Sequence, residues 1–178
     1  MFVWSFVAHM FLGLGTMGFS QMPPAGEPAA IAAMKAGTGD KAGLYIFPGL
    51  TGQDQAAMKA HEEKVKTSPS GLLLYHPAPG SGMEPRQLIG EFLLELVESL
   101  IAVWLISKTA MTGLGSRVAG FAVIGVLAAI TTNASNWLWY GFPQAFSIGA
   151  MIMELGKYVF AGVAAAFVMG MKPKADAA

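Results

Sequence analysis

Three glutamates share one face of a stretch that is otherwise apolar. Glu91, Glu95 and Glu98 lie within residues 88–107, spaced four and three residues apart, which makes them neighbours on the surface of a helix. A carboxylate can hold a proton, bind a cation or pair with a basic group. An ionised carboxylate in hydrocarbon costs on the order of 2.5–3.5 kcal/mol, so we expect these side chains to face polar groups, water or a partner rather than lipid.

Other polar groups are expected at the same depth. Glu154 and Lys157 lie three residues apart in another apolar stretch, as far from its start as Glu95 and Glu98 are from the start of theirs. His9 lies halfway along a third apolar stretch, and residues 131–133, Thr-Thr-Asn, fall near the level of the first glutamate. We predict an intramembrane polar layer. Its members are His9, Glu91, Glu95, Glu98, Glu154 and Lys157.

Four interpretations of this layer stay open. We favour a structural network of hydrogen-bonded acids that holds the helices together. The alternatives are a proton or cation path, a metal site, and contact with a partner protein. No Glu-x-x-His pair of the kind that di-iron bundles use is present, so we predict no metal site and no cofactor. A single intramembrane histidine such as His9 is also a possible pigment or haem ligand, which is the less favoured interpretation.

Composition indicates that the apolar stretches cross a membrane. The 178 residues are 54% hydrophobic and 12% charged, and the mean hydropathy is +0.51, whereas ordinary soluble domains are about 25% charged. Equal numbers of acidic and basic residues give no charge for nucleic acid to recognise, and the lack of cysteine excludes disulfides and thiolate sites. Since a bilayer core requires about 20 helical residues, we predict four transmembrane helices. They cover residues 2–20, 86–107, 115–137 and 144–171.

The predicted fold is therefore an all-α integral membrane bundle. Its parts are a first span in 1–20, interpreted as an uncleaved anchor, an ordered extracytoplasmic segment in 21–85, three spans in 86–171 and a cytoplasmic tail in 172–178. The basic residues Lys108, Arg117, Lys172 and Lys174 lie beside the short loop and the tail. Because cytoplasmic loops are rich in Lys and Arg, we expect both termini to face the cytoplasm of a bacterium and the inner membrane to hold the chain.

The segment 21–85 contains signals of local structure. Pro28 suits a first helical turn and Gly37 a helix end. Thr51 and Asp54 resemble a capping box that opens a second helix. Two apolar runs bounded by Gly and Pro, GLYIFPGL and SPSGLLLYHPAPG, are expected to be short strands or extended pieces.

Small and aromatic residues suggest how the helices pack and where they end. Small residues recur every four positions on the third and fourth predicted spans, which lets helix backbones approach closely. We expect packing within the bundle, with homo-oligomerisation as the alternative. These positions are Gly125, Ala129, Gly162, Ala166 and Gly170. Aromatic residues at the outer end of the third span are expected to anchor it at the membrane interface. They are Trp137, Trp139 and Tyr140.

Two segments resemble a group of known sequences. NASNWLWYGFPQAFSIG and SPSGLLLYHP look similar to segments of uncharacterised small four-helix bacterial inner-membrane proteins. The resemblance covers about a fifth of the chain. It implies a four-span layout and a bacterial source, and it implies no activity.

No motif of a nucleotide-binding or hydrolytic enzyme is present. The chain lacks GxxxxGK[ST], HExxH and GxSxG, and its GLGTMG lies in a predicted span. We therefore predict a non-catalytic accessory or scaffold subunit of a larger membrane complex, respiratory or photosynthetic, whose partners are the bilayer and other subunits or further copies. The alternatives are a small proton- or cation-conducting transporter that uses the acidic layer, and a membrane enzyme with Glu and His metal ligands.

Overall fold

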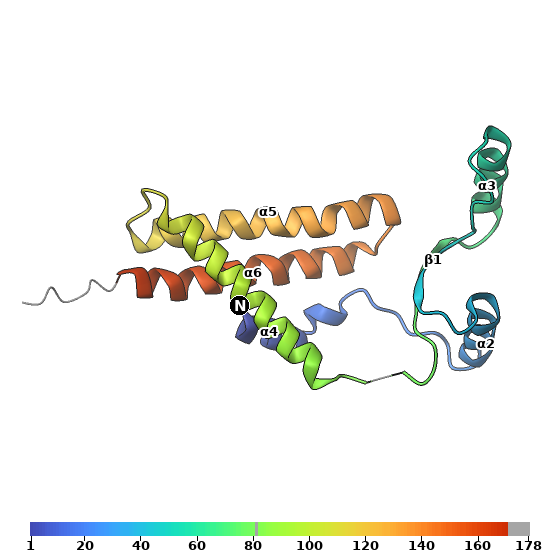
Figure 1. The fold of residues 1–178 in the computed structure, drawn as a ribbon, viewed down its shortest axis with the longest axis horizontal. Helices are drawn as coiled ribbons and strands as arrows, with labels where there is room; N and C mark the ends of the chain where they lie inside the picture. Colours follow the sequence, from blue (N-terminus) through green and yellow to red (C-terminus); the bar gives the residue numbers. More distant parts are fainter. Residues whose placement is uncertain (81, 171–178) are drawn as a thin grey trace, which may run out of the picture. The chain divides into compact units, whose positions relative to one another are not determined.

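The computed structural model describes residues 1–80 and 82–170 and divides the chain into two compact units (Figure 1). The first unit joins Met1–Phe19 to the chain from Met83 onward, and the second is Ser20–Gly82. All six residues of the predicted polar layer belong to the first unit. The predicted tail, with Lys172 and Lys174, lies outside the described residues.

Two long helices, packed side by side, form the body of the first unit (Figure 1). They are α5 (Leu114–Tyr140) and α6 (Gln144–Gly170). Gly141 ends α5 with a φ of 65°, a left-handed conformation that glycine adopts without a steric penalty. Pro143 then precedes α6, and its carbonyl accepts a hydrogen bond from the backbone N–H of Ser147. The sequence therefore predicted this pair of helices to within a few residues of their described ends.

Reciprocal contacts between glycines and aromatic rings hold α5 against α6. A Cβ atom on Gly125 would lie 2.8 Å from Cβ of Tyr158, and one on Gly162 would lie 2.7 Å from Cβ of Phe121. Both rings are buried in the main apolar cluster. Ala129 and Ala166 are buried as well, whereas Gly170 is exposed and has no atom near its Cβ position. Each helix thus supplies a ring that fits against a glycine of the other.

The helices α1 (Phe2–Met10) and α4 (Pro85–Ser107) contact this pair. A capping box between Glu84 and Gln87 opens α4. Trp4 holds α1 against α6, because its Nε1–H donates to the carbonyl of Met153 at 2.9 Å and its ring stacks on Phe160 with the centroids 4.8 Å apart. A single 3₁₀ turn, η1 (Leu14–Thr16), follows α1.

The predicted four-span bundle is wrong. Among the described residues, only α5 and α6 are long and apolar enough to cross a membrane. Gly13, with a φ of 64°, leads into η1, and α1 has only nine residues, about 14 Å at 1.5 Å per residue against a bilayer core of about 30 Å. The helix α4 is long enough, but Glu91, Glu95 and Glu98 make it too polar by the same measure. The predicted spans in 2–20 and 86–107 are therefore not membrane-spanning candidates.

The second unit contains two helices and a two-stranded antiparallel sheet whose strands are joined through α3. Its elements are α2 (Glu27–Thr38), β1 (Gly43–Phe47), α3 (Gln55–Thr67) and β2 (Gly71–Tyr75). The strands pair antiparallel, with Tyr45 opposite Leu73. Asp54 alone caps α3, its carboxylate accepting from the N–H of Ala57 at 2.7 Å, so the predicted start at Thr51 is wrong. The helix α2 runs past Gly37 and is capped by Gly39.

None of the described residues of this second unit is buried. Leu44 and Leu74 lie opposite each other on one face of the two-stranded sheet and are 67% and 68% exposed. Secondary structure normally buries its apolar face against another element. The second unit therefore leaves several large apolar side chains exposed, among them Leu44, Ile46 and Leu74.

Candidate functional site: a glutamate–lysine cluster and a polar cleft

Lys157 lies among three carboxylates where α4 meets α6. Its Nζ is 3.1 Å from Oε2 of Glu154, 3.7 Å from Oε2 of Glu98 and 3.8 Å from Oε1 of Glu95. The sequence predicted contact with either Glu95 or Glu98, with Glu154 as a competing partner. The structure brings all three glutamates to the one lysine, and we refer to these four residues as the glutamate–lysine cluster.

Burial within the cluster is deepest at Glu95. Its side chain is 2% exposed and that of Lys157 is 13% exposed. Oε1 of Glu95 accepts a hydrogen bond from the hydroxyl of Ser5 in α1, so three helices meet at this carboxylate. Its Oε2 has no hydrogen-bond partner among the described residues, and neither has Oε2 of Glu98. A buried carboxylate oxygen without a donor is unfavourable, so these oxygens can accept from a further donor.

Burial along α4 is unusual, because it includes a glutamate and leaves large apolar side chains exposed. Glu95, Ala102 and Ile106 are the only buried residues of α4, while large apolar side chains such as Leu94 and Trp104 are exposed. Glu95 is thus buried while much of the apolar surface of α4 is exposed, whereas a helix in a soluble protein buries its apolar face. The helix α4 contacts α6 through its glutamates, so its position depends on their contacts with Lys157.

A polar cleft of about 260 Å³ lies beside the cluster. It is formed by side chains of α1, α4, α5 and α6. They are Ser5, His9, Glu91, Thr132, Asn133, Ala150, Met153, Glu154 and Lys157. The two predicted polar-layer residues outside the cluster, His9 and Glu91, both line this cleft. The ring of His9 also packs against Gly15 of η1.

Sequence reasoning missed Ser5 as a member of the site. Ser5 lies one helical turn before His9, and this spacing placed it on the same face of α1. A single serine in an apolar helix gives a weak signal, because its hydroxyl commonly bonds to the backbone of its own helix. Its contact with Glu95 depends on how α1 packs against α4, which no local pattern specifies.

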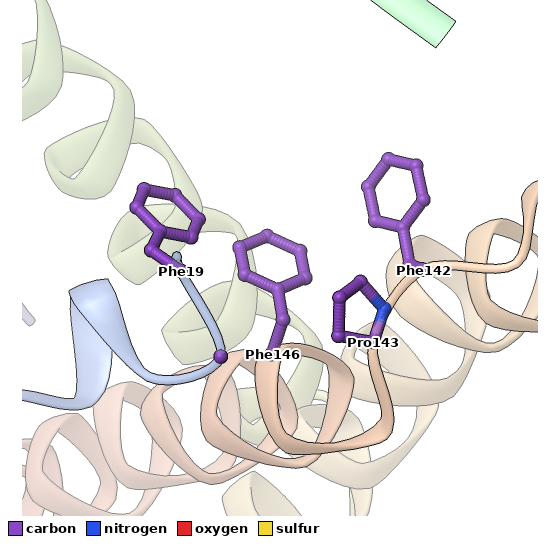
Figure 2. Close-up of a pocket in the computed structure, with 5 residues that line it drawn as sticks. Phe19, Phe142, Pro143 and Phe146 are labelled. Carbon is purple, nitrogen blue, oxygen red and sulfur yellow. The ribbon is translucent and has the colours of Figure 1, made fainter. Parts of the chain in front are cut away.

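An aromatic pocket of about 170 Å³ lies where α5 turns into α6. Figure 2 shows the rings of Phe19 and Phe146 side by side, with Pro143 and Phe142 on the other side of Phe146. Phe146 has both other rings at a centroid distance of 5.5 Å. Gly18, with a φ of 80°, lets the chain pass close to the backbone of Phe146. These contacts fix the end of the Met1–Phe19 segment on α6.

The predicted interfacial anchors lie at the last turn of α5. Trp137, Trp139 and Tyr140 are all exposed, as amphipathic rings at a membrane interface would be. Among residues 1–80 and 82–170, no three His, Asp or Glu side chains are grouped so that they could hold a metal ion.

The fold and the cluster define an α-helical protein with two helices able to span a membrane and a polar site beside them. Comparison with protein-family models, curated proteins and solved structures finds no match to this chain.

Proposed function

We propose that this chain is a non-catalytic accessory subunit that anchors part of a larger protein assembly to the inner membrane of a bacterium. The observation that carries the proposal is the exposure of the second unit, Ser20–Gly82. None of its described residues is buried, and a sheet of only two strands is marginally stable in water by itself. A unit of this kind gains its apolar contacts from another protein.

Membrane anchoring rests on α5 and α6. In each helix only 22% of the most apolar stretch is buried, whereas the core helix of a soluble protein would be mostly buried. The two helices form a two-pass hairpin in this proposal. Lys108 precedes α5 and Arg117 lies in its first turn, and positive charge favours the cytoplasmic side. Both termini then face the cytoplasm.

The outer surface of α4 also supports a subunit role. Its exposed apolar side chains include Phe92, Leu94, Leu100 and Trp104, and large exposed apolar surfaces mark protein or membrane contacts. Because α4 is not a candidate membrane span, this proposal has a neighbouring subunit bury the apolar surface of α4.

The test is purification of the chain from its native membrane in a mild detergent, followed by mass measurement of the intact complex. We expect a stoichiometric complex with other subunits. Leu44→Asp and Leu74→Asp introduce charge on the exposed face of the two-stranded sheet and should release the partner, while Ala36→Asp on exposed α2 should not. A free monomer whose second unit resists proteolysis would contradict the proposal.

A second candidate function, a proton or cation path, is favoured by the polar cleft. Glu91 and the cluster residue Glu154 line it, and acidic side chains in membrane helices commonly mark ion pathways. Flux measurements on the purified chain in liposomes distinguish the two functions. A flux that Glu91→Gln abolishes would favour conduction, and an absence of flux would favour the accessory subunit.

A further inference from the structure

The glutamate–lysine cluster contains more negative than positive charge. Its three carboxylates lie 3.1–3.8 Å from the Nζ of Lys157, which is the only basic group within ion-pair distance of them among the described residues. One ammonium balances one carboxylate, so two negative charges stay uncompensated when all three glutamates are ionised. Like charges that share a partly buried site favour the uptake of a proton by one of them.

The other titratable groups nearby do not offset this charge. None of them forms an ion pair with the three glutamates in the described part of the chain, and Glu91, on the same face of α4, adds a further negative charge. The titratable residues of α5 lie only near its ends. The complete set on the helices packed together here comprises Glu91, Tyr158, His9, the amino group of Met1, Arg117 and Tyr140.

Hydrogen bonding distinguishes the three carboxylates of the cluster. Glu154 lies closest to the ammonium, at 3.1 Å, and Glu95 accepts a hydrogen bond from the hydroxyl of Ser5. Oε2 of Glu98 is 3.7 Å from Nζ of Lys157, beyond hydrogen-bonding distance, and this buried oxygen has no donor among the described residues. Hydrogen bonds to an ionised carboxylate stabilise the ionised form, so Glu98 is the least stabilised of the three as an anion.

We propose that the glutamate–lysine cluster is a proton-binding site, and that Glu98 holds the proton at pH values where an ordinary glutamate is ionised. Burial raises the pKa of the Glu98 carboxyl, Lys157 lowers it and the neighbouring carboxylates raise it, so that the net direction is upward. The protonated group also supplies an O–H donor on the helix face that it shares with Glu95, whose Oε2 has no donor among the described residues.

A proton that only the folded chain holds makes stability depend on pH. Between the ordinary pKa of a glutamate and the raised pKa of Glu98, the folded state carries more protons than the unfolded state. The free energy of unfolding therefore falls as pH rises through that window, and the contact between α4 and α6 weakens. The proposal is independent of the accessory-subunit role, because it concerns contacts within the first unit.

The test is thermal unfolding of the full chain in detergent at about pH 5.5 and about pH 8, both above the range in which an ordinary glutamate titrates. At equal ionic strength, wild type should have a Tm roughly 2–4 °C higher at the lower pH, the shift that about a fivefold change in the unfolding equilibrium gives in a chain of this size. Glu98→Gln is uncharged at both pH values, so its Tm should change little between them. Equal wild-type Tm values would overturn the proposal, and so would a full pH dependence in Glu98→Gln.

Two further variants assign the pH dependence to the cluster. Glu63→Gln on α3 removes a carboxylate whose side chain is 61% exposed and paired with Lys66, and it should keep the full wild-type dependence. Histidine also titrates in this pH range, so His9→Gln tests the histidine that lines the polar cleft, and it too should keep the dependence. A pH dependence that disappears in His9→Gln would assign the proton to the histidine and overturn the proposal.

Infrared spectroscopy detects the proton directly, because a protonated carboxyl group has a C=O band that is separate from the bands of a carboxylate. At about pH 5.5, where an ordinary glutamate is mostly ionised, wild type should show this band at higher intensity than Glu98→Gln. The band should weaken as the pH is raised, over the same range in which the wild-type Tm falls. A wild-type band that does not change over this range, or identical spectra for the two proteins, would overturn the proposal.

Discussion

The ring of Phe121 in α5 packs directly on Gly162 in α6. A Cβ atom at position 162 would lie 2.7 Å from Cβ of Phe121 and 3.0 Å from its Cγ. Those atoms are close to the backbone and cannot swing away as the end of a long side chain can. Phe121 is fully buried, so the distance between the two helices at this level depends on the absence of a side chain on Gly162.

Gly162→Ala should therefore destabilise the first unit. Inserting a methyl group into a well-packed contact typically costs about 1–3 kcal/mol, because the helices must separate or the ring must leave its rotamer. Thermal unfolding of the detergent-solubilised protein measures the loss.

A matched control comes from α5 itself. The Cβ position of Gly115 has no atom within 4 Å, so Gly115→Ala should be neutral or slightly stabilising through its lower conformational entropy in the unfolded chain. Adding Phe121→Leu to Gly162→Ala should recover part of the loss. A Gly162→Ala variant as stable as wild type would mean that this contact does not set the helix spacing.

The sequence predicted the helices over α4, α5 and α6 because long apolar runs bounded by Gly, Pro and basic residues contain strong local signals. It failed at α1. Gly13 and Gly18 adopt positive φ values, but glycine also occurs frequently within membrane helices, so its presence did not reveal that the helix ends at Met10. The prediction that α4 crosses the membrane was wrong. Its three glutamates were expected to face the inside of a bundle, so they were not counted against a membrane span.

The candidate site was predicted in part for a related reason. Helical spacing identified the face shared by Glu91, Glu95 and Glu98, and matching depths identified Lys157 as a neighbour. Which carboxylate it would contact depends on helix crossing, which depth alone does not determine. Ser5 and the shape of the cleft depend on the position of α1, and no periodic pattern encodes that position.

Lys157→Met should destabilise the protein strongly. Lys157 and Glu95 are nearly buried, and removing one partner of a buried ion pair leaves an uncompensated charge, at a cost of about 3–5 kcal/mol. Adding Glu95→Gln removes the charge left behind and should recover part of the loss. Thermal stability of both single variants and the double variant gives the coupling between them.

A surface lysine provides the comparison. Lys66 pairs with Glu62 and Glu63 on α3, and all three side chains are more than half exposed, so Lys66→Met should change stability by less than about 1 kcal/mol. If the losses from Lys157→Met and Glu95→Gln simply add, the two residues are not coupled. The glutamate–lysine cluster would then not hold α4 in place.

The two-pass proposal predicts on which side of the membrane the second unit lies. If only α5 and α6 cross, the second unit lies on the same side as both termini, whereas four spans would put it on the opposite side. The chain has no cysteine, so Gln144→Cys at the start of α6 and Ser70→Cys before β2 each give one labelling site. In spheroplasts, a membrane-impermeant maleimide should label Gln144→Cys directly and Ser70→Cys only after lysis. Labelling of both before lysis would require a further crossing by α4, and labelling of Ser70→Cys alone would reverse the orientation assigned from Lys108 and Arg117.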